Sequence, residues 1–155
     1  MPELTVEELS EEDARELEEL FKEVWSRALE YSEEWRRKRM LTRSQIVEEM
    51  RSGYKYFGVR IGGKIAGVYK AKVEGDTLLG EHQSVRLEFR RKGLAKAMYR
   101  QFISYAREVG CRKVRVNILP SQEPSLRLVR EFGFKKVGSF EQAPGMLVDI
   151  YEREV

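Results

Sequence analysis

The apolar residues of the first fifty positions follow first a strand-like and then a helix-like spacing. Residues 4–9 alternate loosely between apolar and polar, which predicts a short strand. A helix is predicted next, because Ser10 and Asp13 form an approximate capping box and apolar residues then recur every three or four positions. These apolar residues are Leu17, Leu20, Phe21, Val24, Ala28 and Leu29. A second short helix is predicted over residues 43–50.

The rest of the chain alternates between strand and helix patterns. Strands are predicted over residues 54–61, 65–73 and 77–87, with glycine-containing turns between them. Further helices are predicted over residues 94–109 and 124–132, and further strands over residues 114–118, 134–140 and 146–151. The element order is β-α-α-β-β-β-α-β-α-β-β. It predicts an α+β fold with a mixed, mostly antiparallel central sheet flanked by helices.

Composition narrows the class of protein. With 155 residues, 41% of them hydrophobic, the chain can bury one sizeable core, so we expect a single domain over residues 1–155. No run of about 18 apolar residues occurs and the N-terminus is acidic, which predicts a cytoplasmic protein with no membrane partner. One cysteine, Cys111, and one histidine, His82, argue against an internal disulfide and a metal site. The net charge of +3 is too small to favour nucleic acid as a partner.

Residues 85–95 carry the most specific signal, because a strand is predicted to end there and a helix to begin after a short basic turn. Arg90, Gly93 and Ala95 have the spacing Arg-x-x-Gly-x-Ala. Glycine lets backbone N–H groups converge on one point, and the helix dipole adds positive potential. Three successive cations at residues 90–92 strengthen the preference for an anion. The sequence therefore predicts a turn that binds a phosphate or pyrophosphate.

These residues together resemble the central motif of the GNAT superfamily of acyl-CoA-dependent N-acetyltransferases. The family motif runs Val-x-Pro-x-(aromatic)-(Arg/Gln)-x-x-Gly-x-(Gly/Ala), and Leu87 stands where proline is usual. The matching residues are Val85, Phe89, Arg90, Gly93 and Ala95. Gly133 and Phe134 follow the last predicted helix, as Gly-Phe does in the family. The resemblance covers roughly residues 54–152 and implies the GNAT fold.

The resemblance implies acetyl-CoA as the cosubstrate and no metal ion. Its pantetheine arm would lie along the strand that ends at Val85, and its pyrophosphate would lie on the amides of the turn. The implied CoA-binding residues of this segment are Val85, Arg90, Arg91, Lys92, Gly93, Leu94 and Ala95. Gln122 and Ser125 occupy the asparagine and alanine positions of the family's last helical motif, and they complete the implied set.

Acetyl transfer to an amine needs a group that removes a proton from the amine. Glu81 lies four residues before Val85, and this strand parity predicts that both side chains project to one side. GNAT enzymes commonly place a Glu or His base on this strand, so the resemblance implies Glu81 as general base. The alternative is an ordinary solvated glutamate. By the same parity His82 points to the opposite face, and we interpret it as a packed or surface histidine.

The general acid of the family is missing from this sequence. Many members carry Asn-x-x-Ala-x-x-x-Tyr before Gly-Phe, and here Val129 holds the tyrosine position. Water would then protonate the thiolate, or Ser121, Ser125 or Tyr151 would replace the tyrosine. The main hypothesis is an N-acetyltransferase that acts on a primary amine of a small molecule or peptide. The alternative hypothesis, motivated by Val129, is a non-catalytic regulator that binds acyl-CoA.

Two charged stretches leave the acceptor and further partners open. The basic run of residues 36–39 is a solvated helix face or, alternatively, a docking patch for an acidic partner or nucleic acid. Glutamates of the first predicted helix would attract a polyamine or basic peptide, or simply solvate the helix. They are Glu11, Glu12, Glu16, Glu18, Glu19 and Glu23. Many members of the family are dimers, so a homodimer is one option for the assembly.

Overall fold

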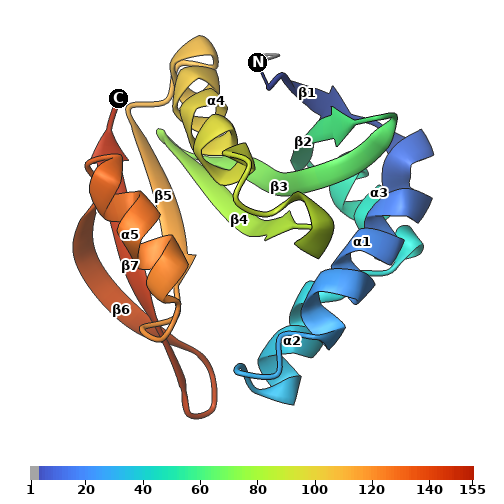
Figure 1. Cartoon of the computed structure of the whole chain (residues 1–155). Coiled ribbons are helices and arrows are strands. Elements are labelled where there is room, and N and C mark those ends of the chain that lie inside the picture. Colours follow the sequence, from blue (N-terminus) through green and yellow to red (C-terminus); the bar gives the residue numbers. More distant parts are fainter. Residues whose placement is uncertain (1–3) are drawn as a thin grey trace. The chain divides into compact units, whose positions relative to one another are not determined.

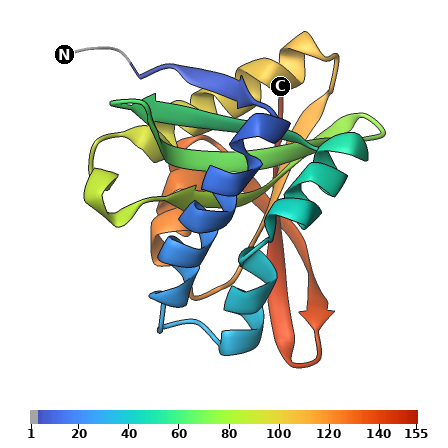
Figure 2. The same ribbon diagram turned by 90° about the vertical axis from the view of Figure 1, so that its right-hand side faces the viewer.

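The computed structural model describes residues 4–155, which form a seven-stranded sheet and five α-helices (Figures 1 and 2). The strand order is β1-β2-β3-β4-β5-β7-β6. The pair β4–β5 is parallel, whereas β1–β2, β2–β3, β5–β7 and β6–β7 are antiparallel. The fold is therefore the mixed α+β arrangement that the pattern of apolar residues predicts. No helix in the described part of the chain is long and apolar enough to cross a membrane.

The elements follow one another with short connections. The N-terminal half contains β1 (Val6–Leu9), α1 (Ala14–Ser26), α2 (Glu33–Arg39), α3 (Arg43–Arg51), β2 (Lys55–Ile61), β3 (Lys64–Glu74) and β4 (Thr77–Val85). The C-terminal half contains α4 (Leu94–Glu108), β5 (Lys113–Ile118), α5 (Glu123–Glu131), β6 (Lys135–Ala143) and β7 (Met146–Glu154). These elements group into two compact units. Unit 1 comprises the residues up to Ala71 and His82–Met98, and unit 2 comprises Lys72–Glu81 and Tyr99–Val155.

Unit 1 builds its core between β1, β2 and β3 and the helices that cover them. α1 and α3 cross one face of these strands, and the first turn of α4 lies on the other (Figure 2). α1 buries a stripe at helical spacing, formed by Ala14, Leu17, Leu20, Phe21, Val24 and Trp25. Each fully buried Leu or Phe contributes about 2 kcal/mol relative to an exposed one. Gly67 of β3 lies so close to Leu94 and Met98 of α4 that an added Cβ would be 3.2 Å from each.

Unit 2 packs α5 and the body of α4 against strands. Val114, Val116 and Ile118 alternate with more exposed residues along β5, and α5 runs in front of β5 and β7 in Figure 1. The ring of Tyr99 on α4 stacks on Phe132, with ring centroids 5.5 Å apart. Burial in this aromatic cluster raises the pKa of Tyr99. The phenol is therefore part of the core.

The structure departs from the predicted elements in three places. Residues 33–39 form an additional helix, α2, which Ser32 caps by accepting a hydrogen bond from the Trp35 backbone N–H (3.2 Å). α1 ends at Ser26, so Leu29 lies beyond it and is 75% exposed, contrary to its predicted place on the core face. β4 ends at Val85, earlier than predicted, because a 3-10 turn begins at Leu87.

Candidate functional site

The turn before α4 presents a row of backbone donors. Arg91 and Gly93 are both left-handed, with φ of 63° and 82°. The first hydrogen bond of α4 runs from the Ala97 N–H to the Gly93 carbonyl (3.0 Å). Within residues 4–155, the N–H groups of residues 91–95 have no acceptor. A left-handed turn that leads into a helix N-terminus gathers such N–H groups into a concave, electropositive site for an anion.

The side chains of this turn add positive charge to it. Arg90, Arg91 and Lys92 are exposed. Arg90 donates from Nε to the Val85 carbonyl (3.4 Å), which holds its stem close to the end of β4. Within the described residues, the side chains of Arg91 and Lys92 make no hydrogen bond or ion pair. Their charges are therefore available to a ligand, and the turn suits a polyanion such as a pyrophosphate.

A buried arginine, Arg86, anchors the chain just before this turn, and it was not predicted from the sequence. Arg86 is 4% exposed, and its Nε donates to the Ile65 carbonyl of β3 (2.7 Å). Its guanidinium also pairs with two glutamates of α1, Glu23 at 3.1 Å and Glu16 at 3.5 Å. Because its charge is matched inside unit 1, Arg86 ties the end of β4 to β3 and α1. In the sequence it is one arginine among several, so no local signal distinguishes it.

β4 is kinked at His82, whose φ of 54° is left-handed. Before the kink, Gly80 faces α4 so closely that an added Cβ would lie 2.7 Å from the Phe102 ring. After the kink, the His82 ring packs edge-on against Phe21 of α1, with centroids 6.5 Å apart. Residues two apart in a regular strand face the same way. The left-handed residue interrupts this regular alternation at His82.

The residues that follow the kink alternate between α4 and α1. Gln83 donates from its side-chain amide to the Ala95 carbonyl of α4 (3.5 Å), whereas Ser84 accepts a hydrogen bond from the Trp25 indole of α1 (2.8 Å). Because Val85 is two residues beyond Gln83, the alternation of a regular strand places its side chain on the α4 side.

The strand-parity expectation for Glu81 and Val85 stays a prediction. One left-handed residue, His82, lies between them in the sequence and interrupts the regular alternation of a strand. The interpretation of His82 as a packed residue is confirmed. Its Nδ1 is buried and has no hydrogen-bond partner in the described chain. Burial, and secondarily the charges of Arg39 and Lys70, hold the pKa of His82 well below its usual value, so the ring is neutral.

Comparison with known proteins places the turn and the fold in one family. The model of the acetyltransferase (GNAT) family matches residues 12–134. The chain belongs to the GNAT acetyltransferase family. Membership of this family makes it an acyl-CoA-dependent acetyltransferase, and acetyl-CoA is its cosubstrate. No curated protein sequence matches the chain significantly.

Solved structures of GNAT proteins have the same fold at low sequence identity. The PaiA N-acetyltransferase of Thermoplasma acidophilum, solved in complex with coenzyme A, is 20% identical with a TM-score of 0.81. The alignment covers 99% of this chain and 100% of that one. The ribosomal-protein-alanine N-acetyltransferase of Brucella melitensis is 16% identical with a TM-score of 0.80, over 98% of this chain and 100% of its own. At these sequence identities, the similarity shows that the fold is shared.

The family's last helical motif lies on α5 in unit 2. Gln122 is 7% exposed, and its side-chain carbonyl accepts a hydrogen bond from the Leu119 N–H (2.8 Å). Ser125 is half-buried in the first turn of α5. Val129, at the tyrosine position, is completely buried. Of the other predicted stand-ins, Ser121 is exposed and Tyr151 is buried on β7.

Glutamates of the first helical segment are largely committed to contacts within unit 1. Glu16 and Glu23 pair with Arg86, Glu11 pairs with Arg51 at 2.8 Å, and Glu18 accepts a hydrogen bond from the Arg43 N–H at 2.9 Å. These contacts neutralise much of the acidic surface that the sequence offers to a polyamine. A hollow of about 530 Å³ remains beside Glu16, Glu19 and Glu23, next to the β2–β3 turn.

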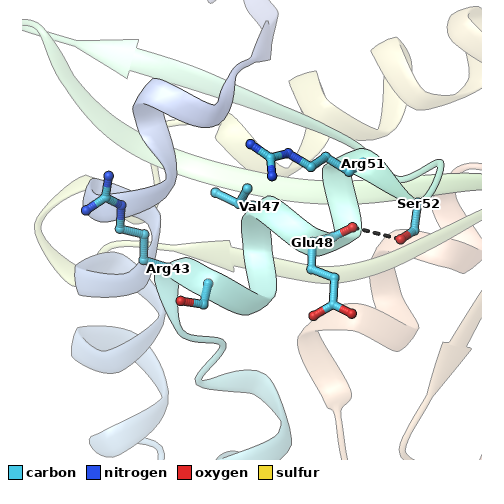
Figure 3. Close-up of a pocket in the computed structure, with 6 residues that line it drawn as sticks. Arg43, Val47, Glu48, Arg51 and Ser52 are labelled. Atoms are coloured by element: carbon cyan, nitrogen blue, oxygen red, sulfur yellow. Dashed lines mark hydrogen bonds between the residues drawn. The ribbon is translucent and has the colours of Figure 1, made fainter.

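A second hollow lies on the outer side of α3 (Figure 3). Its volume is about 440 Å³, and it is lined by Arg43, Ser44, Val47, Glu48, Arg51 and Ser52. Ser52 Oγ donates to the Glu48 carbonyl (2.8 Å), and the guanidinium of Arg51 is paired with Glu11. Neither hollow includes a residue of the turn before α4.

The basic run of residues 36–39 forms most of α2, and three of its cations have partners within unit 1. Arg36 donates to carbonyls near the end of α1 and beyond it, at Trp25 (3.4 Å), Ser26 (3.3 Å) and Tyr31 (3.2 Å). Arg37 pairs with Glu33 one turn earlier at 2.9 Å. Arg39 stacks its guanidinium on the rings of Trp35 and Trp25, at 4.0 and 4.9 Å from their centroids.

Proposed function

We propose that residues 1–155 act as one N-acetyltransferase domain, which transfers the acetyl group of acetyl-CoA to a primary amine of a small molecule or peptide. The observation that carries this proposal is the turn before α4. It combines five successive N–H groups without an acceptor in residues 4–155 with the exposed charges of Arg90, Arg91 and Lys92. Family membership supplies the reaction type.

Acetyl-CoA would bind to unit 1 through its pyrophosphate. The N–H groups of Arg91, Lys92, Gly93, Leu94 and Ala95 would donate to the phosphate oxygens, and the three cations would neutralise their charge. The pantetheine arm would follow the end of β4 at Val85 by strand-like pairing. Coenzyme A bound to the Thermoplasma protein supports this assignment by analogy. Gln122 and Ser125 are proposed as further CoA contacts.

The chemical step is a direct attack of the amine on the thioester. The neutral amine nitrogen forms a bond to the acetyl carbonyl carbon, the carbon–sulfur bond breaks, and the electron pair leaves with the CoA sulfur. We propose Glu81 as the base that accepts the proton of the amine. Because Val129 cannot donate a proton, the leaving thiolate would take its proton from water.

A regulator that binds acyl-CoA without turnover is the second candidate. It is favoured by Val129, which is completely buried where many members of the family have a tyrosine. Thioester turnover distinguishes the two candidates. CoA release that depends on an added amine supports the transferase, whereas tight binding without release supports the regulator. A cytoplasmic location and a homodimer stay predictions.

A thermal-shift titration with acetyl-CoA and free CoA tests the binding step. Ligands that bind only the folded state raise the Tm by mass action, by an amount that grows with the logarithm of ligand concentration. The wild type should show shifts that increase with ligand concentration in this way, and Gly93→Trp should lose them because its side chain occupies the anion site. Gly53→Trp is the matched control, since Gly53 is also left-handed and open to solvent but lies after α3. Equal shifts in all three proteins would contradict the assignment of the turn.

Amine-dependent release of CoA tests the role of Glu81. Glu81→Gln should lower kcat by about 100-fold, the usual contribution of general base catalysis, and leave the affinity for acetyl-CoA unchanged. Glu74→Gln is the matched control, because Glu74 is an exposed glutamate at the end of neighbouring β3. An unchanged kcat in Glu81→Gln would assign the base elsewhere and leave the CoA site intact.

A further inference from the structure

The turn before α4 has few contacts of its own to hold its shape. The N–H groups of residues 91–95 have no acceptor in the described chain, and the first hydrogen bond of α4 comes only with Ala97. Arg91 is left-handed, with φ of 63°, which is unfavourable for a residue other than glycine. A backbone of this kind persists only where the surrounding structure holds it. The contacts on either side of the turn therefore decide whether its amides converge on one point.

Residues 64–67 of β3, which we call the β3 platform, contact the chain on both sides of the turn. Before the turn, the carbonyl of Ala66 accepts a hydrogen bond from the backbone N–H of Arg86 (2.9 Å). Two residues later, Glu88 pairs with Lys64 Nζ (2.6 Å). The platform and these partners all belong to unit 1. The chain that leads into the turn is therefore attached to β3 at two points.

The β3 platform also supports the chain after the turn. Gly67 lies so close to α4 that an added Cβ would be 3.2 Å from the side chains of Leu94 and Met98. Leu94 is 2% exposed and Met98 is completely buried, so the first turn of α4 packs directly on β3. One short segment of one strand thus fixes both ends of the turn. Because packed interiors transmit small shifts, a displacement at either end would move the amides between them.

Arg86 is the most extensive of these attachments. Its Nε donates to the Ile65 carbonyl (2.7 Å), and its two Nη atoms pair with Glu23 (3.1 Å) and Glu16 (3.5 Å) of α1. Glu16 in turn accepts a hydrogen bond from the N–H of Ile65 (2.6 Å). Arg86 is 4% exposed, and each of its three side-chain nitrogens has a partner. Its guanidinium therefore binds the β3 platform and α1, and it does not face a ligand.

We propose that Arg86 is a positioning residue for acetyl-CoA, because its guanidinium fixes the chain before the turn to β3 and α1 and so presets the amides of residues 91–95 for the pyrophosphate. The inference rests on the proposed function, in which this turn binds that pyrophosphate. Arg86 acts through the backbone and does not touch the ligand. A site whose donors are already in place loses less entropy on binding, so the fixed geometry raises the affinity.

A substitution that keeps the charge separates geometry from electrostatics. Arg86→Lys retains the positive charge, but a single ammonium cannot reproduce the fork that reaches the Ile65 carbonyl and two carboxylates. Arg60→Lys is the matched control. Arg60 of β2 also pairs with two carboxylates, Glu7 (2.5 Å) and Asp13 (2.6 Å), and its side chain has no other partner in the described chain. Both substitutions break a forked ion pair, and only the first should affect the turn.

A second pair of variants acts from α1. Glu23→Gln removes one carboxylate from Arg86. Glu19→Gln, its matched control, removes an exposed carboxylate one helical turn earlier, which has no partner among the described residues. Each change removes one negative charge, which by itself favours an anionic ligand. Glu23→Gln should nevertheless weaken binding, because it holds Arg86 less firmly.

Affinities for acetyl-CoA and for inorganic pyrophosphate are measured by isothermal titration calorimetry, well below the Tm of every variant. Arg86→Lys should weaken the binding of both probes about tenfold, and Glu23→Gln about threefold. Arg60→Lys and Glu19→Gln should change either affinity less than about twofold. Unchanged affinity in Arg86→Lys, an equal loss in Arg60→Lys, or tighter binding by Glu23→Gln would overturn the proposal.

A second readout needs no ligand. The amide NMR signals of residues 91–95 report the geometry of the turn in the free protein. Arg86→Lys and Glu23→Gln should move these signals in the same direction, and the two controls should leave them nearly in place. Unmoved signals in both Arg86→Lys and Glu23→Gln would overturn the inference. A wild type that binds neither probe would instead count against the proposed function, and the amide signals would still decide the role of Arg86, so the two failures are distinguishable.

Discussion

The two basic runs of unit 1, residues 36–39 and residues 90–92, have similar compositions but differ in the contacts that their side chains make. In residues 36–39, three of four cations are taken up by carbonyls, a glutamate and tryptophan rings. In residues 90–92, the side chains stay exposed, and the backbone between them turns left-handed ahead of a 15-residue helix. The first run has the denser charge, yet only the second is arranged to hold an anion.

The two runs differ in backbone geometry more than in charge density, and it is backbone geometry that makes the second run suitable for an anion. N–H groups at the start of a helix cannot find partners inside the helix, so they remain available to a ligand. Arginine side chains are versatile, and where aromatic rings and carbonyls lie nearby they stabilise the fold. A run of cations is therefore ambiguous until its neighbours are known.

The largest expected effect is on the affinity for acetyl-CoA. Arg91→Glu combined with Lys92→Glu should weaken binding by about 100-fold, because two charge-assisted contacts to phosphate are replaced by repulsion. The same reversal in the other run, Arg37→Glu with Lys38→Glu, should change the affinity less than about twofold. Isothermal titration calorimetry at one salt concentration measures both. Equal losses in the two double variants would erase the distinction between the runs.

The second effect is on the free energy of unfolding, where a substitution in residues 36–39 should have a larger effect than one in residues 90–92. Arg39→Ala removes a guanidinium stacked on two tryptophans and should lower the free energy of unfolding by about 1–2 kcal/mol. Arg91→Ala should change it by less than about 0.5 kcal/mol, because the side chain of Arg91 has no partner in the described chain. Urea denaturation compares the two variants. A larger loss in Arg91→Ala would mean that the second run is structural.

The third effect is also on the free energy of unfolding, which one glycine substitution should raise and another should lower. Arg91→Gly should raise the free energy of unfolding by about 0.5 kcal/mol, because glycine adopts the left-handed φ of 63° without steric cost. Lys38→Gly should lower it by about 0.5–1 kcal/mol, because Lys38 lies within α2. Thermal unfolding of the two variants provides the test. Destabilisation by Arg91→Gly would show that this backbone is not strained.

The smallest effect is on the titration of His82, which NMR follows directly. Burial is the main cause of its low pKa and Arg39 is the second, so Arg39→Met should raise this pKa while leaving it below 6.5. Arg91→Met should not move it. Since the folded pKa is lower than the unfolded one, the unfolded chain takes up the proton first. Stability should therefore fall as the pH drops below about 6.5, and His82→Asn should remove this part of the pH dependence.

Sequence reasoning succeeded where the determinants are local. The capping box of Ser10 and Asp13, the glycine turns and the motif around Gly93 all lie within a few positions of the structure they specify, and each is found. α2 was missed because its sequence is almost wholly charged and only Trp35 is buried. The kink at His82 was not predicted, because nothing in the residues around it indicates a left-handed backbone.

By itself, the sequence determined the order of the strands and of every α-helix except α2, the family, and the turn that is proposed to bind a phosphate. These follow from spacing and from glycine, which act over one or two turns of chain. The tertiary structure decided which cations make stabilising contacts within the fold, how Arg86 is buried, and where β4 bends. Those outcomes depend on partners far away in sequence, such as Trp25 for Ser84 and Glu23 for Arg86, 59 and 63 positions apart. Hydrogen bonds and ion pairs of this kind exist only once the chain has folded.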